Sequence, residues 1–182
     1  MKELEYPFDA AYIIKKRKSL KKALLADGTS RIRKKIAVFG GSTTSDIVKT
    51  LELFLLDAGI EPEFYESEYA QYFQDAMFPD ETLLSFKPDI VFIHTTNRNV
   101  TNWPEMTDTT EQIDQKLHTE LNRFTAMWKS IAEKFHCPII QNNFEMPLYR
   151  LLGSRDAWDI HGRTNFLTRL NEAFYAYARE NE

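Results

Sequence analysis

The sequence lacks several features that define whole classes of protein. Its 182 residues include one cysteine, Cys137, so an internal disulfide is excluded. No apolar run approaches the roughly 20 residues that a membrane-spanning helix needs, and the opening residues Met1 to Pro7 do not have the pattern of a secretion signal. These absences favour a cytoplasmic protein, and 43% hydrophobic with 27% charged residues are ordinary values for a globular domain.

Residue patterns for metal and nucleotide binding are also missing. No two histidines or cysteines have the short spacing of a zinc site, and the acidic residues are scattered. The stretch from Gly40 to Thr44 lacks the lysine and the spacing of a phosphate-binding loop, and it lacks the third glycine of a dinucleotide-binding loop. We therefore expect no metal or cofactor in this chain.

Charge is distributed unevenly, although the net charge is only −4. Residues 1–35 carry eleven Lys or Arg against four Asp or Glu, a balance of +7, so the remainder carries −11. We expect a loosely amphipathic helix from Asp9 to Leu25. Its solvent-exposed face carries the basic residues Lys15, Lys16, Arg17, Lys18, Lys21 and Lys22.

This basic face has two main interpretations. It is either a solvated face of a helix packed on the domain or a docking surface for an acidic partner such as an acyl carrier protein. Nucleic acid suits it less well, because no aromatic residues are interleaved with the basic ones for base stacking.

Apolar runs of strand type alternate four times with segments of helical periodicity. The expected strands cover residues 36–39, 62–65, 89–94 and 137–142, and the helices that follow them cover 47–58, 69–78, 110–135 and 164–178. Such alternation is typical of right-handed βαβ units. The sequence therefore predicts a three-layer α/β fold with a parallel sheet of at least four strands, in the order 2-1-3-4.

Polar residues collect where these strands end. Ligands of parallel sheets bind at the carboxyl ends of the strands, near the point where the strand order reverses. We therefore expect the substrate to contact residues at these ends, namely Gly40, Gly41, Thr43, Thr44, His94, Thr96, Arg98, Asn142 and Asn143.

Ser42 occupies the position of a nucleophile, in a sharp turn from a buried strand into a helix. The adjacent glycines allow the turn, and the helix start offers unpaired N–H groups and partial positive charge. A nucleophilic serine also needs a base and donors for the oxyanion. Asn97 is a candidate donor, and His161, oriented by Asp156 or Asp159, is a candidate base. The alternative is a capped turn without chemistry.

Two of these motifs resemble those of a known family. SGNH hydrolases carry Gly-Asp-Ser at the end of their first strand, where this chain has Gly40-Gly41-Ser42, and a Gly-x-Asn-Asp-like turn after a later strand, where this chain has Asn97. More narrowly, Phe-Gly-Gly-Ser-Thr-Thr and Phe-Ile-His-Thr-Thr-Asn look like the amino-terminal domain of FkbH-like proteins. Those are multidomain enzymes of the HAD phosphatase superfamily that load a glyceryl group onto a carrier protein.

The resemblance implies an SGNH-hydrolase or flavodoxin-like domain over residues 35–182, preceded by the basic helix and linker of residues 1–34. Two residues depart from the family pattern, since Gly41 replaces its Asp and Arg98 stands where the SGNH turn has Asp. The Asp-x-x-His block that SGNH enzymes take from after a fifth strand and the Asp-x-Asp of HAD phosphatases are both absent. We therefore expect a fragment of a longer multidomain protein, with Mg²⁺ only in a HAD domain that would follow.

Two functional hypotheses remain. One is an enzyme domain that carries out acyl or glyceryl transfer, or ester hydrolysis, at Ser42. The other is a non-catalytic module that binds a carrier protein or positions substrate for a following catalytic domain.

Overall fold

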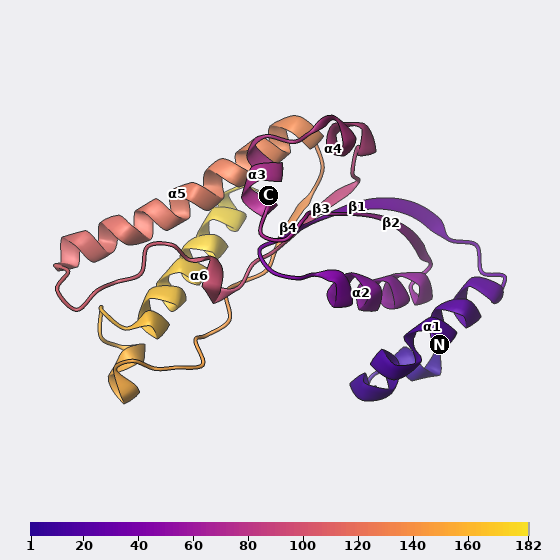
Figure 1. Ribbon diagram of the computed structural model, residues 1–182, viewed down its shortest axis with the longest axis horizontal. Coiled ribbons are helices and arrows are strands. Elements are labelled where there is room, and N and C mark those ends of the chain that lie inside the picture. The colour runs from indigo at the N-terminus through magenta and orange to yellow at the C-terminus, as the bar shows by residue number, and fades with distance from the viewer. Residues whose placement is uncertain (182) are drawn as a thin grey trace.

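The computed structural model describes residues 1–181, and its order of elements is that of a parallel α/β domain (Figure 1). The strands are β1 (Ile32–Gly40), β2 (Ile60–Glu66), β3 (Ile90–His94) and β4 (Ile139–Gln141). The α-helices are α1 (Ala10–Ala26), α2 (Ser45–Asp57), α3 (Tyr72–Met77), α4 (Glu81–Phe86), α5 (Thr110–Phe135) and α6 (Arg163–Glu180). Short 3₁₀ helices cover η1 (Lys2–Leu4), η2 (Asn97–Asn99) and η3 (Gly153–Ala157).

The four strands form one parallel sheet in the order β2-β1-β3-β4, which confirms the predicted fold and strand order. β1 lies between β2 and β3, and its register places Gly40 beside His94. The strand order reverses direction at β1. The carboxyl ends of β1 and β3 therefore flank the switch point at which parallel sheets bind ligands.

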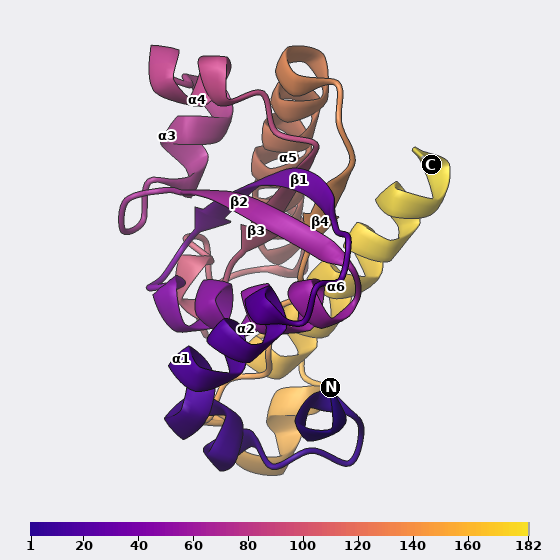
Figure 2. The same cartoon turned by 90° about the vertical axis from the view of Figure 1, so that its right-hand side faces the viewer.

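Side chains of the central strands alternate between two apolar layers. Ala37, Phe39, Val91 and Ile93 join the larger core cluster with helices α3 to α6, whereas Ile36, Val38 and Phe92 pack against α2. Figure 2 shows α1 and α2 on one side of the strands and α3, α4 and α5 on the other. Because both faces are covered there, the second half of β1 and β3 are nearly continuous apolar runs. The edge strand β2 carries glutamates on its exposed positions.

Helix α1 forms an additional layer outside α2. Its buried residues Ile13, Leu20 and Leu24 share a core cluster with Leu53 and Leu56 of α2. Asp9 caps the helix by accepting a hydrogen bond from the N–H of Tyr12 at 3.0 Å. The amino-terminal helix therefore packs on the α/β domain.

Most element boundaries agree with the sequence prediction within a few residues. The expected long helix over 110–135 coincides with α5. Strand β1 begins four residues earlier than expected, at Ile32, and β4 is limited to three residues. The sequence prediction missed α4, a single short helix that Asp80 caps through the N–H of Leu83.

None of the helices within residues 1–181 combines the length and the apolarity that a bilayer crossing requires.

Adjacent isoleucines of α1 test its packing on α2. Ile13 is 2% exposed and Ile14 is 61% exposed. We expect Ile13→Ala to lower the free energy of unfolding by roughly 2–5 kcal/mol, because it removes a buried side chain and leaves a cavity. Ile14→Ala should change it by less than about 0.5 kcal/mol. Urea denaturation measures both values, and equal effects of the two substitutions would show that α1 is not docked as described.

Candidate functional site

The turn after β1 is anchored to the neighbouring strands through its backbone and through Thr44. The N–H of Gly41 donates to the carbonyl of His94 at 2.8 Å. The hydroxyl of Thr44, which is 2% exposed, donates to the Glu66 carboxylate at the end of β2 at 2.9 Å. Between these anchors, Ser42 is half-buried. Its hydroxyl makes no hydrogen bond within residues 1–181, so it is available to a ligand.

Asn99 clamps the other side of this turn. Its side-chain Nδ2 donates to the carbonyl of Gly41 at 2.9 Å, and its Oδ1 accepts from the N–H of Thr96 at 2.8 Å. A Cβ atom placed on Gly41 would lie 2.6 Å from the Cγ of Asn99. Position 41 therefore has no room for a side chain while Asn99 holds this place. The sequence prediction missed Asn99, although Thr96-x-x-Asn99 has the spacing of a capping box, which the structure forms.

A buried ion pair on α5 fixes the loop that carries Asn99. The Glu120 side chain is fully buried, and its Oε1 accepts from the N–H groups of Thr101 and Asn102 at 2.9 and 2.8 Å. Its Oε2 accepts from Arg123 at 2.8 Å, and Arg123 also donates to the carbonyl of Asn99 at 2.7 Å. These contacts link α5 to the Ser42 turn through Asn99.

The charge state of Glu120 follows from the same contacts. Burial alone would raise the pKa of its carboxyl, but the hydrogen bonds from Thr101 and Arg123 outweigh burial and lower it. For Arg123, burial would lower the pKa of the guanidinium, but the contacts with Glu120 and Tyr72 together outweigh burial and raise it. Both groups are therefore charged, and the partly buried Arg123 compensates the negative charge of the fully buried Glu120.

Asn97, the expected oxyanion donor, has another partner in this structure. Its Nδ2 donates to the carbonyl of Glu145 at 3.4 Å, and its backbone N–H contacts the Glu145 carboxylate at 3.2 Å. Arg98, next in the chain, is exposed. Asn97 therefore ties η2 to the segment after β4, and an oxyanion role would require its amide to turn away from Glu145.

Asn142 and Asn143 also make contacts within the protein. The side chain of Asn142 accepts from the N–H of Thr95 and donates to the carbonyl of Thr95, each at 2.8 Å. The side chain of Asn143 donates to the hydroxyl of Tyr175 on α6. Asn142 thus continues the pairing of β4 with β3 beyond the end of the strand.

His94 is the histidine that the sheet register brings to the Ser42 turn. It pairs with Gly40 across β1 and β3, and its ring packs edge-on against Phe92 at 6.1 Å between centroids. Its Nδ1 is buried and has no hydrogen-bond partner within the described chain. An unsatisfied buried ring nitrogen is uncommon, so His94, like Ser42, has unused hydrogen-bonding capacity beside the turn.

His161, the expected base, is held by two other groups. Its Nδ1 lies 2.9 Å from the Asp159 carboxylate, and its Nε2 lies 3.1 Å from the carbonyl of Asp108. Both partners are acceptors, so both ring nitrogens donate and the ring is favoured in its charged form. These bonds, first that to Asp159, raise the pKa of His161, while the N–H and ring of His161 lower the pKa of Asp159 to about 2. In this arrangement His161 has no free nitrogen to accept a proton.

Asp156, the expected orienting acid, caps α6. Its side chain accepts from the N–H of Thr164 at 2.8 Å and lies within 3.4 Å of the N–H of Leu152. Burial would raise the pKa of this fully buried carboxyl, but its bonds to Thr164 outweigh burial and lower it. Neither Asp156 nor His161 makes a hydrogen bond to Ser42.

The structure thus brings some of the predicted site residues together and leaves others apart. Asn97, Asn142 and Asn143 are held by Glu145, Thr95 and Tyr175, as described above. Backbone pairing of β1 with β3 gathers Gly40, Gly41, Ser42, His94 and Thr96 around the turn, with Thr43 exposed beside them. His161 and Asp156 lie elsewhere, in the segment that leads into α6, where His161 is bonded to Asp159 and Asp108 and Asp156 to Thr164 and Leu152. Within residues 1–181, no group of three or more His, Cys, Asp or Glu is arranged to hold a metal ion.

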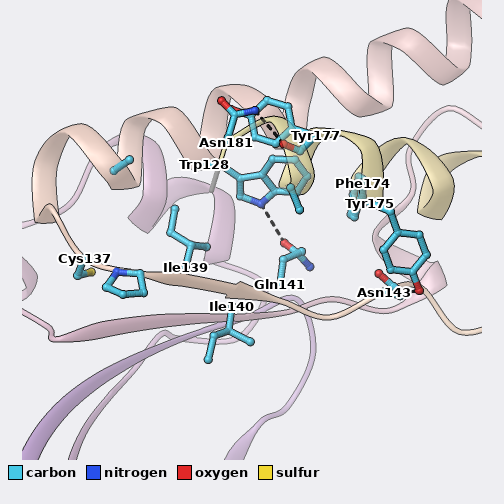
Figure 3. A pocket seen from close by; sticks show the side chains of 13 residues that line it. Trp128, Cys137, Ile139, Ile140, Gln141, Asn143, Phe174, Tyr175, Tyr177 and Asn181 are labelled. Atoms are coloured by element: carbon cyan, nitrogen blue, oxygen red, sulfur yellow. Dashed lines mark hydrogen bonds between the residues drawn. The ribbon is translucent and has the colours of Figure 1, made fainter.

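A hollow of about 600 Å³ lies elsewhere, along the outer edge of β4 (Figure 3). Its walls include Trp128 of α5 and Phe174 and Tyr177 of α6, and Trp128 donates from Nε1 to the side chain of Gln141 at 3.3 Å. None of its thirteen lining residues is charged, and none belongs to the Ser42 turn.

Comparison with known proteins identifies a structural neighbour. No family model and no curated protein sequence matches the chain. A crystal structure of the N-terminal part of the protein BF1531 from Bacteroides fragilis, described as containing a phosphatase domain and complexed with Mg, is similar with a TM-score of 0.67 and 19% sequence identity. The match covers 90% of this chain and 42% of that one. At this identity the similarity shows a related fold.

The clamp between Asn99 and Gly41 predicts a pairwise energetic coupling. We expect Gly41→Ala to destabilise the protein by about 1–3 kcal/mol, because the new methyl group displaces the Asn99 side chain. In an Asn99→Gly background the same substitution should cost much less, since the obstructing side chain is gone. A double-mutant cycle from urea denaturation measures this coupling, and strictly additive effects would show that the two residues do not interact.

Proposed function

We propose that the Ser42 turn is a site of acyl chemistry, in a domain that acts in acyl or glyceryl transfer to a carrier protein or in ester hydrolysis. The observation that supports this most directly is the free, half-buried hydroxyl of Ser42 in a turn held rigidly on both sides. A preorganised nucleophile at the switch point of a parallel sheet suits attack on a carbonyl carbon. The proposal assigns the chain to the SGNH-like amino-terminal domains of FkbH-like proteins.

The turn also has donors for the charge that such an attack develops. Ser42 Oγ would form a bond to the carbonyl carbon while its proton passes to solvent water, and the carbonyl π electrons would move onto the carbonyl oxygen. Collapse of this intermediate would re-form the C=O bond and expel the alcohol or thiol of the substrate, which takes a proton from water. Ser45 and Asp46 open α2, and Thr44, the residue before them, makes no side-chain cap to the first N–H groups of the helix. These N–H groups and the positive end of the helix dipole would stabilise the oxyanion.

The clamp by Asn99 accounts for the departure of position 41 from the SGNH motif. The motif carries Asp where this chain has Gly41, and here the Asn99 side chain occupies the space beside the Cα of that residue. In this chain the side chain of Asn99 therefore holds the turn in place, through its hydrogen bond to the carbonyl of Gly41. In the proposal, Asn97 becomes an oxyanion donor only after its side-chain amide breaks its hydrogen bond to the carbonyl of Glu145. Substrate binding would have to provide the free energy for this rearrangement.

A second function, a non-catalytic binding module, is favoured by the lack of an arranged base. Within residues 1–181 no histidine makes a hydrogen bond to Ser42, and His161 is committed to Asp159 and Asp108. Such a module would bind a carrier protein or present substrate to a following catalytic domain. The chain spans 42% of the neighbour's length, and we propose that it likewise works within a longer, HAD-family protein whose phosphatase domain would bind Mg²⁺.

The basic face of α1 is the expected docking surface for the carrier. Lys15, Lys16, Lys18 and Lys22 are exposed. Arg17 and Lys21 instead form ion pairs with Asp46 and Glu52 of α2, at 2.9 and 2.7 Å. Four of the six basic residues therefore stay available to an acidic partner.

Ester hydrolysis separates the two functions. We expect slow hydrolysis of p-nitrophenyl acetate, slightly above background, because a serine site without its base keeps only residual catalysis from positioning and oxyanion stabilisation. Ser42→Ala should abolish this excess rate. Ser30→Ala, at an exposed serine in the turn between α1 and β1, is the matched control. Equal rates for wild type and Ser42→Ala would favour the binding module.

A further inference from the structure

Positive charge is concentrated on the outward side of α1, which carries six Lys or Arg and no Asp or Glu. Two of the six are neutralised by α2, since Arg17 pairs with Asp46 and Lys21 pairs with Glu52. The other four are exposed and make no ion pair within residues 1–181. We call these four the lysine patch: Lys15, Lys16, Lys18 and Lys22.

Negative charge is concentrated in the stretch that forms β2, α3 and α4. From Thr50 to Phe86 the sequence has nine Asp or Glu and no Lys or Arg. Lys134 of α5 reaches α3, but it donates to the carbonyl of Met77 and pairs with none of these acids. Four of the nine are exposed and have no cationic partner in the part of the chain that the structure describes. We call these four the acidic patch: Glu63, Glu68, Asp80 and Glu81.

The members of the acidic patch act on the same neighbouring groups. Burial and then the negative charges of Asp75, Asp80 and Glu68 raise the pKa of the Tyr65 hydroxyl. Burial and then repulsion by Asp80 and Glu68 raise the pKa of the Asp75 carboxyl, although a bond from Ser67 opposes this. Glu63, two positions before Tyr65, lies on the same face of β2. These acids therefore form one surface of uncompensated negative charge.

The two patches lie on opposite sides of the molecule. Figure 2 shows α1 on one side of the strands and α3 and α4 on the other. The patches therefore cannot pair within one molecule, whereas the lysine patch of one copy can meet the acidic patch of another. Exposed apolar side chains accompany both, with Ile14 and Leu25 61% and 53% exposed on α1, and Tyr69 and Phe78 73% and 68% exposed beside the acids. Apolar contacts bordered by complementary charge are typical of protein interfaces.

We propose that the lysine patch of one copy binds the acidic patch of a second copy, so that the chain associates head to tail with itself. The second copy fits because it presents four negative charges to four positive ones. The two patches are different surfaces, so the contact is heterologous and leaves one patch free at each end, where further copies can add until a ring closes. Neither patch contains Ser42, so this inference does not depend on the proposed acyl chemistry. A second copy would compete with a carrier protein for α1.

Sedimentation velocity of the full chain at low salt measures the association. We expect wild type to form larger species as its concentration rises and to return to monomer as salt is raised. Lys15→Glu with Lys18→Glu, and separately Glu63→Lys with Glu68→Lys, should each weaken association by at least about tenfold, because each pair leaves its patch without net charge. Both variants should keep the thermal unfolding midpoint of wild type, since exposed charges contribute little to stability.

A matched control has the same change in net charge as the lysine variant. Arg150→Glu with Arg179→Glu alters two exposed arginines outside both patches and should change association by less than about twofold, because neither arginine faces the second copy. Equal loss of association in this control would overturn the proposal, because the effect would then follow net charge alone.

Mixing the two patch variants tests the pairing directly. The lysine variant keeps a working acidic patch and the glutamate variant keeps a working lysine patch, so an equimolar mixture should form a dimer with one copy of each and nothing larger, although each variant alone is monomeric. A mixture that stays monomeric, or a wild type that stays monomeric at low salt, would overturn the proposal. If wild type is monomeric and the lysine variant loses binding of an acyl carrier protein, α1 serves the carrier instead.

Discussion

The buried carboxylate of Glu120 is the interaction on which the arrangement at the strand ends depends. A carboxylate in the interior is costly unless charge and hydrogen bonds compensate it. Here Arg123 supplies the charge, and Thr101 and Asn102 supply N–H donors from the loop after β3. The loop cannot leave this position without abandoning a buried charge. That constraint holds Asn99 in place, and Asn99 in turn holds the Ser42 turn.

The residues that hold the turn in place are different from the residue proposed to react, Ser42. The turn is fixed by backbone groups and by Asn99, and the Ser42 hydroxyl makes no hydrogen bond among the described residues, so it remains open to a ligand. Hydrogen-bond donors for an oxyanion lie near Ser42, but a general base does not, because both ring nitrogens of His161 are hydrogen-bonded to Asp159 and Asp108. The same loop reaches the segment after β4 through Asn97 and Glu145.

The fold was predictable because its signals are local in the sequence. The β-branched runs of β1 and β3, and the periodic apolar face of α5, fix the type and order of the elements, and the alternation of strands with helices determines a parallel sheet. The glycine turn was found for the same reason. Asn99 and Glu120 were missed because their roles arise from contacts with residues 58 and 19 positions away. The sequence offered Asp156 or Asp159 as the partner of His161, and the structure has Asp159 in that place. The carbonyl of Asp108 that occupies the second ring nitrogen comes from 53 positions away.

The most direct test of this account is amide hydrogen exchange, measured residue by residue by NMR, in Glu120→Gln. We expect the N–H groups of Thr101 and Gly41 to lose protection by roughly tenfold or more, since hydrogen bonds to a charged group contribute about 1.5–3 kcal/mol. The N–H of Val91, in the core strand β3, should follow only the change in global stability. Glu133→Gln, at an exposed position of the same helix, should leave all three unchanged. If Gly41 keeps its protection in Glu120→Gln while Thr101 loses it, the turn does not depend on the buried carboxylate.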